Sequence, residues 1–255
     1  MTQAGIDFGY PFWLNYGHLC VTAAAGAALV AAFWFGSPIA LRLGLAALVV
    51  WAVVSATIAH VGIAPTRVPS LPTGAFLVSG GGRVLDVGAG TGRSSLMVLT
   101  ARPRASVVAS DLFSSSFERH FGDERRPIDR LRRNLEAAGM SDRATIEVAD
   151  MRALPFTDAT FDAVVSAYAM DHIGREGAEA AVREAHRVLR PGGEFLLIVV
   201  NDDWWGRIAF GPMLAHGNLP SPAWWREVGK AAGFRPVESG TRPITSWFLF
   251  VRDDG

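Results

Sequence analysis

The chain has 255 residues, with 24 Lys plus Arg balanced by 24 Asp plus Glu, so its formal net charge is zero. That length fits one α/β domain with an appendage. The balanced charge gives no reason to expect a nucleic-acid partner, and a single cysteine, Cys20, excludes an internal disulfide. The mean hydropathy of +0.24 is high for a soluble enzyme, and its source lies in the first 64 residues.

Two long apolar runs occupy that N-terminal part. They cover residues 18–35 and 39–63 and are separated by the break Gly36-Ser37-Pro38. Each run reaches about the 20 residues that a helix needs to cross the hydrocarbon core of a bilayer. The sequence therefore predicts a transmembrane helical hairpin over residues 1–64.

The flanks of the hairpin predict how it sits in the membrane. Residues 1–17 contain no Lys or Arg, which disfavours a cleaved signal peptide. Arg67 and Arg83 follow the second run and only Arg42 lies near the tip, so the positive-inside rule places both termini in the cytoplasm, at a bacterial inner membrane. An interfacial aromatic belt is predicted from Phe8, Tyr10, Phe12, Trp13 and Tyr16.

A second interpretation of the two runs stays open. They are rich in alanine and include Arg42, as expected of a helical pair buried in a soluble protein, where it would serve as a lid or an oligomer interface. Homo-oligomer formation is compatible with either interpretation.

After a Pro- and Gly-rich linker at residues 65–82, strand and helix signals alternate through residues 83–255. This alternation predicts a doubly wound α/β domain with a parallel sheet and a final antiparallel pair. The expected strands cover 83–87, 106–110, 145–149, 161–167, 193–200, 234–238 and 245–251. The expected helices cover 91–101, 128–138, 175–189 and 222–232.

The stretch Val84 to Gly92 reads as a buried strand followed by a glycine turn. Its pattern, Asp86-x-Gly88-x-Gly90-x-Gly92, differs from the Gly-x-Gly-x-x-Gly of dinucleotide binders. Glycines at these positions let the backbone turn sharply and let a ligand approach the main chain.

Three further stretches follow in order: Asp111 at the end of the next strand, residues 147–156, and residues 161–173 followed by 188–193. Together with the glycine turn they resemble the class I methyltransferases that use S-adenosylmethionine (SAM), over roughly residues 76–253. The nearest resemblance is to the small-molecule and lipid branch, which is similar to the quinone C-methyltransferases. The resemblance implies a seven-stranded Rossmann-like sheet, SAM as cofactor and S-adenosylhomocysteine as product.

The resemblance also implies roles for individual residues. The methionine moiety would lie against Asp86, Gly88, Ala89, Gly90, Thr91 and Gly92. Asp111 would accept hydrogen bonds from the ribose hydroxyls, and Asp150 from the adenine amino group, unless the two acids are strand-end caps or surface charges. Leu112 and Met151 would cover the adenine faces, and Ser166 and Ala167 would lie near the sulfonium.

Candidates for proton transfer lie just past the fourth strand: Tyr168, Asp171 and His172. A base is needed only if the acceptor must first lose a proton. His216 is a weaker catalytic candidate. Trp204 and Trp205 could line an apolar acceptor pocket or lie at the membrane surface, although core packing is the simpler interpretation. An insertion at 113–127 carries Phe113, Phe117 and Phe121 at the spacing of a short amphipathic helix. No Cys/His cluster has metal-ligand spacing, so we expect no metal.

These features predict an enzyme, a membrane-anchored SAM-dependent methyltransferase that acts on a hydrophobic small molecule or lipid. Two alternatives stay open: methylation of a soluble small molecule, and a SAM-binding membrane sensor without turnover.

Overall fold

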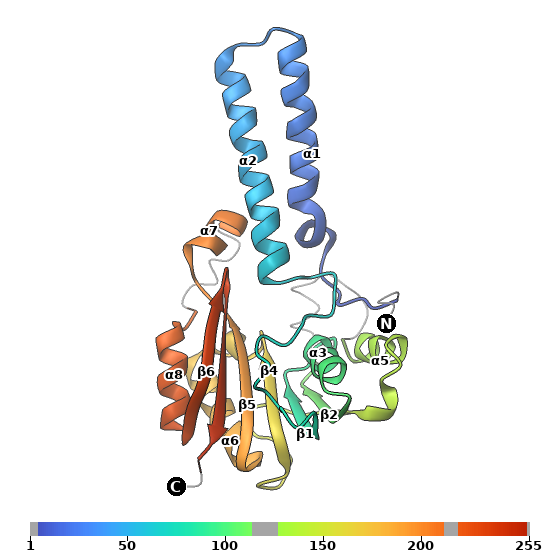
Figure 1. Ribbon diagram of the computed structural model, residues 1–255, viewed down its shortest axis with the longest axis vertical. Coiled ribbons are helices and arrows are strands. Elements are labelled where there is room, and N and C mark those ends of the chain that lie inside the picture. The colour runs from blue at the N-terminus through green and yellow to red at the C-terminus, as the bar shows by residue number, and fades with distance from the viewer. Residues whose placement is uncertain (1–4, 114–126, 212–218, 254–255) are drawn as a thin grey trace.

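The computed structural model describes residues 5–113, 127–211 and 219–253. Two antiparallel helices, α1 (Phe12–Trp34) and α2 (Ile39–Gly62), project from one end of an α/β domain (Figure 1). Most of the predicted helix at 113–127, and His216, lie outside the described residues.

The domain is built on a seven-stranded sheet in the order β3-β2-β1-β4-β5-β7-β6. All neighbouring strands from β3 to β5 are parallel, and β7 is inserted antiparallel between β5 and β6. This confirms the predicted seven-stranded α/β sheet. The strands are β1 (Gly81–Val87), β2 (Arg104–Asp111), β3 (Ala144–Val148), β4 (Phe161–Ala167), β5 (Leu189–Val200), β6 (Phe234–Arg242) and β7 (Thr245–Arg252).

Two hydrophobic cores cover the two faces of the sheet, one beneath α3 and α5 and the other beneath α6 and α8. Central strands are mainly apolar because both of their faces are covered, as Leu85 and Val164 show by being fully buried. The helices are α3 (Arg93–Ala101), α5 (Pro127–Ala137), α6 (Gly174–Val188), α7 (Trp204–Phe210) and α8 (Pro222–Ala231).

Several predicted boundaries were wrong. Helix α3 begins at Arg93 and not at residue 91, because Gly92 adopts a left-handed φ of +90° that ends the turn before the helix starts. Strand β5 begins at Leu189 and not at residue 193, since Leu189 pairs with Phe161 ahead of an irregularity in the ladder. Helix α7 was not predicted at all.

The hairpin also differs from its prediction at the N-terminal end. Helix α1 begins at Phe12 and so includes Trp13 and Tyr16. Phe8 is only 5% exposed and packs into the core of the domain, so it does not belong to an interfacial belt. Both helices are long and apolar enough to cross a membrane, and only 11% and 17% of their most apolar windows are buried by the protein.

Candidate cofactor and acceptor site

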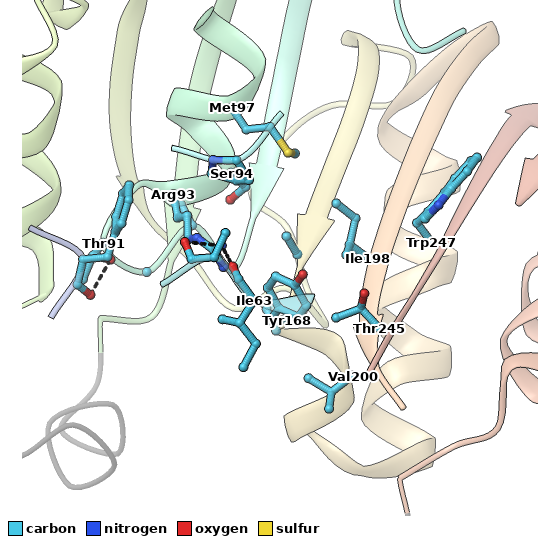
Figure 2. Close-up of a pocket in the computed structure, with 18 of the residues that line it drawn as sticks. Ile63, Thr91, Arg93, Ser94, Met97, Tyr168, Ile198, Val200, Thr245 and Trp247 are labelled. Atoms are coloured by element: carbon cyan, nitrogen blue, oxygen red, sulfur yellow. Dashed lines mark hydrogen bonds between the residues drawn. The ribbon is translucent and has the colours of Figure 1, made fainter. Parts of the chain in front are cut away.

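A cavity of about 920 Å³ lies at the carboxyl ends of β1, β2, β4 and β5. An open α/β sheet leaves its ligand crevice at this edge. Figure 2 shows residues from distant parts of the chain around it, among them Ile63, Arg93, Tyr168 and Trp247. The cavity is therefore shared between the sheet and the segment that joins it to the hairpin.

The glycine turn forms one wall. Gly88 and Gly92 have φ values of +77° and +90°, and a Cβ would collide with Ala169 at the first position and with Leu131 at the second. The backbone N–H groups of Gly88 and Ala89 donate to the Ser110 carbonyl oxygen at 2.8 and 3.0 Å. These contacts explain why the turn needs glycine and how β2 holds its shape.

Asp111 links that turn to the end of β2. One carboxylate oxygen accepts from Gly90 N at 3.0 Å and the other from Phe113 N at 2.8 Å. Burial raises the pKa of the Asp111 carboxyl, although these two donors oppose the shift. Asp111 lines the cavity together with Leu112, as the sequence predicts for a ribose-binding acid and its apolar neighbour.

Ten of the fifteen predicted site residues line the cavity: Gly88, Ala89, Gly90, Thr91, Asp111, Leu112, Met151, Ala167, Tyr168 and His172. The other five, Asp86, Gly92, Asp150, Ser166 and Asp171, are not among the lining residues.

Asp86 lies behind the wall and supports it. Its carboxylate accepts from Ser94 Oγ at 2.8 Å and from Ser95 Oγ at 2.5 Å, so it ties β1 to the first turn of α3. Complete burial raises the pKa of Asp86 to about 6, with the two serine hydroxyls opposing the shift. Ser94 lines the cavity, whereas Asp86, to which it donates, does not.

The side chains of Asp150 and Ser166 also form hydrogen bonds with other residues of the protein. The Asp150 carboxylate accepts a bidentate contact from Arg152, with a shortest distance of 2.6 Å, and this hydrogen bonding lowers its pKa. Ser166 Oγ donates to the Val87 carbonyl oxygen at 2.8 Å. Its side chain therefore faces β1.

The three candidates for proton transfer separate into two kinds. Tyr168 and His172 line the cavity, whereas Asp171 accepts from the backbone N–H of Val200 at 3.0 Å. Burial raises the pKa of Tyr168 to about 12, so its phenol stays protonated at neutral pH. Tyr168 also has a φ of +57°, which places this residue in a strained turn directly after β4.

Arg93 is the central residue that the sequence analysis missed. It is only 8% exposed, lies 5.6 to 6.0 Å from the rings of Phe8, Tyr10 and Tyr168, and lines the cavity. Its guanidinium donates hydrogen bonds to the carbonyl oxygens of Ile63 and Ala64, the two residues that directly follow α2 (Figure 2). An arginine directly after the last glycine was the available signal, but its partners are 29 and 30 residues away.

An N-terminal strap, residues 5–11, completes the enclosure. Thr91 Oγ1 donates to the Phe8 carbonyl oxygen at 3.1 Å. The Asn134 amide donates to the carbonyl oxygens of Asp7 and Thr91 at 2.9 and 2.8 Å. The strap is therefore fastened to the same turn that was expected to hold the methionine moiety.

Part of the α/β domain matches a known protein family. Residues 84–193 match the family model described as a methyltransferase domain. The 27-O-demethylrifamycin SV methyltransferase of Amycolatopsis mediterranei is 30% identical over 174 residues, which cover 66% of this chain and 53% of that protein. A ubiquinone/menaquinone biosynthesis C-methyltransferase of Cereibacter sphaeroides is 32% identical over 118 residues, 46% of this chain and 42% of that protein. The chain spans about half the length of these curated relatives.

Two solved structures show the same fold. An O-methyltransferase family 2 protein from Planctomyces limnophilus, in complex with apigenin, aligns with a TM-score of 0.55 at 19% identity and covers 79% of this chain and 60% of its own. The [4+2]-cyclase SpnF aligns with a TM-score of 0.54 at 18% identity, covering 71% and 77%. At such identities the likeness concerns the fold and not the reaction.

The family match shows a methyltransferase domain over residues 84–193, and the strand order and the glycine turn followed by Asp111 resemble those of the class I SAM-dependent methyltransferases. Within that class it is related to the quinone C-methyltransferases.

Proposed function

We propose that this chain is a membrane-anchored methyltransferase that transfers the methyl group of SAM to a hydrophobic, lipid-resident small molecule. One observation carries the proposal. The cavity that contains the glycine turn and Asp111 continues without a break to Val61–Ala64, where the apolar hairpin meets the domain. An acceptor dissolved in the membrane would thus reach the cavity at the point where the hairpin, which anchors the protein, joins the domain.

The residues of the turn fit the cofactor by their chemistry. Asp111 offers carboxylate oxygens to hydroxyl donors, main-chain groups of Gly88 to Thr91 line the wall, and Met151 and Leu112 offer apolar surface to a flat base. When bound, SAM supplies a methyl group already activated on a sulfonium. The protein then has to orient the acceptor and exclude water.

The far part of the cavity suits an apolar acceptor. Ile198, Val200 and Trp247 line it from β5 and β7, and Val61 and Ile63 line it from α2 and the residue after it. His172 lines the cavity, and histidine is the side chain that most often transfers protons in enzymes. We therefore assign to His172 any proton that the acceptor loses, and to Tyr168 a part in the cavity wall.

The exposure of the hairpin supports anchoring. Large apolar side chains along both helices face outward, as shown by the exposed fractions of 59% for Val30, 64% for Leu43 and 62% for Val50. A helix pair packed inside a soluble protein would bury such side chains, and an apolar surface of this kind requires a partner. We propose that this partner is the bilayer, with the domain in the cytoplasm as the positive-inside rule predicts.

The direct test is to incubate the detergent-purified full chain with methyl-labelled SAM and a total membrane lipid extract. We expect label in an extractable hydrophobic compound, and no label with Asp111→Ala. Label confined to a water-soluble acceptor would overturn the lipid-resident substrate and favour a soluble small molecule. Tight SAM binding with no labelled product, either hydrophobic or water-soluble, would instead favour a sensor.

A further inference from the structure

Helix α7 packs against the foot of the hairpin, beyond the end of the sheet (Figure 1). Trp51 Nε1 of α2 donates to the Ile208 carbonyl oxygen at 2.8 Å, and Ser55 Oγ lies 3.5 Å from the same oxygen. The His18 Nε2 atom of α1 lies 2.6 Å from the Ala209 carbonyl oxygen. Three polar side chains of otherwise apolar helices thus converge on the last turn of α7.

These contacts satisfy backbone groups that water usually satisfies. The last four carbonyls of a helix have no partner within the helix. In lipid, each of them needs a protein donor. At the opposite end of α7, the Asp203 carboxylate accepts from the backbone N–H groups of Gly206 at 2.8 Å and Ile244 at 2.9 Å. The carbonyls of Ile208 and Ala209 in the last turn of α7 and the N–H of Gly206 in its first turn therefore have protein partners, as backbone at membrane depth requires.

The aromatic residues of α1 indicate where α7 lies relative to a bilayer. Trp13 and Trp34 are 21 residues apart, which is about 31 Å along a helix and close to the hydrocarbon thickness of about 30 Å. Both side chains are at least 50% exposed, as expected at the two interfaces. His18 is then about 7 Å inside the near boundary, and so is the carbonyl of α7 that it contacts.

Helix α2 leads to the same depth independently. Counting about 30 Å from Ile39 at the tip reaches Ala59. Ser55 lies one turn above that level, about 6 Å inside. Interfacial helices bury their apolar face to about 5–10 Å, at the boundary of headgroups and acyl chains.

We propose that α7 is a third membrane element, which lies at the headgroup–acyl boundary with the bilayer as its partner. This inference rests on the proposed anchoring of the hairpin and extends it to the domain. Trp204 is 59% exposed and stacks on Trp205 with 4.0 Å between ring centroids, an amphipathic pair suited to the interface. The exposed Arg207 forms an ion pair with Asp202 at 2.9 Å and faces the headgroups. The part of the cavity that Ile63 lines then lies beside the leaflet, so an acceptor would enter without crossing water.

Depth-dependent quenching tests the position of α7. In a Cys20→Ser background, a single cysteine at Trp204→Cys is labelled with an environment-sensitive fluorophore, and the full chain is reconstituted in phosphatidylcholine–phosphatidylglycerol liposomes. Lipids carry a nitroxide either near the headgroup or near the end of the acyl chain. Val78→Cys, 74% exposed and just before β1, is the matched control on the domain, and Ser37→Cys reports on the hairpin tip.

We expect the Trp204→Cys label to lose most of its fluorescence with the shallow nitroxide and less with the deep one, and the Val78→Cys label to lose none. Arg207→Cys, on the same helix, should behave like Trp204→Cys and provides a second probe if the first variant fails to fold. Loss of fluorescence at Ser37→Cys with none at either α7 position would overturn the inference and leave the anchoring intact. No loss at any position would overturn both.

Discussion

The sheet and the hairpin are built from similar apolar residues, yet they expose them differently. Leu85 in β1 and Val164 in β4 are fully buried, whereas Leu43 and Val50 in α2 are 64% and 62% exposed. The strands are covered by helices of the same chain, and the outer faces of the hairpin are not. Apolar composition therefore predicts that a segment avoids water, but it does not say whether protein or lipid covers it.

A change at Asp111, in the predicted cofactor site, should weaken cofactor binding more than any other and leave the hairpin unaffected. Asp111→Ala removes a carboxylate that lines the cavity and accepts from Gly90 N, so SAM affinity should fall at least about tenfold, as for a lost charge-assisted hydrogen bond of about 1.5–3 kcal/mol. Titration calorimetry measures it. Membrane association should be unchanged. The control Asp158→Ala, which replaces an exposed acid on the surface, should bind SAM with wild-type affinity. Wild-type affinity in Asp111→Ala would contradict our placement of the ribose.

The contrast in burial can be tested by a matched pair of truncations. Leu85→Ala leaves a cavity in the core and should lower the free energy of unfolding by about 2–5 kcal/mol, whereas Leu43→Ala should change it by less than about 0.5 kcal/mol. Denaturant unfolding in detergent, followed by near-UV circular dichroism, measures both. Equal losses would mean that protein, and not lipid or detergent, covers the outer face of α2.

The buried acid beneath the glycine turn predicts a pH effect confined to the domain. Because the pKa of Asp86 in the folded state is about 6 and lies above its unfolded value, the folded state binds more protons in the window between them. Its contribution to stability is therefore complete at low pH and is lost as the pH rises to about 6, by about 3 kcal/mol in all. Asp86→Asn should remove this slope when unfolding free energies at pH 5 and pH 7 are compared. If the unfolding free energies of the wild type and Asp86→Asn changed equally between pH 5 and pH 7, this prediction would be wrong.

Arg93 connects the α/β domain to the end of the hairpin, so replacing it should weaken the contact between the domain and the hairpin. Arg93→Ala loses the hydrogen bonds to Ile63 and Ala64, each worth about 1.5–3 kcal/mol for a charged donor, and should open the linker and the N-terminal strap to protease. Limited proteolysis with N-terminal sequencing locates the cuts. Arg183→Ala, on the exposed face of α6, is the control. An unchanged digestion pattern would show that Arg93 does not hold the joint.

The smallest effect is expected at Tyr168. Since burial holds its pKa at about 12, the phenol cannot act as a base near neutral pH. Tyr168→Phe should therefore change kcat by far less than the hundredfold or more that loss of a general base costs, with an unaltered pH profile between pH 7 and 9. A hundredfold loss would transfer the proton-handling role from His172 to Tyr168.

Much of the domain could be predicted because its signals are local. The buried strands, the glycine turn and Asp111 each occupy a few consecutive residues, and parallel strands bring their carboxyl ends to one edge of the sheet. The ten predicted residues that line the cavity follow from that rule. Asp86 and Asp150 were placed by the same reasoning, but whether an acid faces a ligand or a neighbour such as Ser95 or Arg152 depends on side-chain packing.

The sequence by itself determined a seven-stranded α/β domain, its glycine turn and two helices apolar enough to cross a bilayer, because periodicity and turn chemistry act within short stretches of chain. Only the tertiary structure decided that Phe8 covers the glycine turn, that Arg93 holds the end of α2 and that α7 packs against His18 and Trp51. These contacts join residues that are 30 to 191 positions apart. Such pairings follow from how the whole chain packs, and no local pattern specifies them.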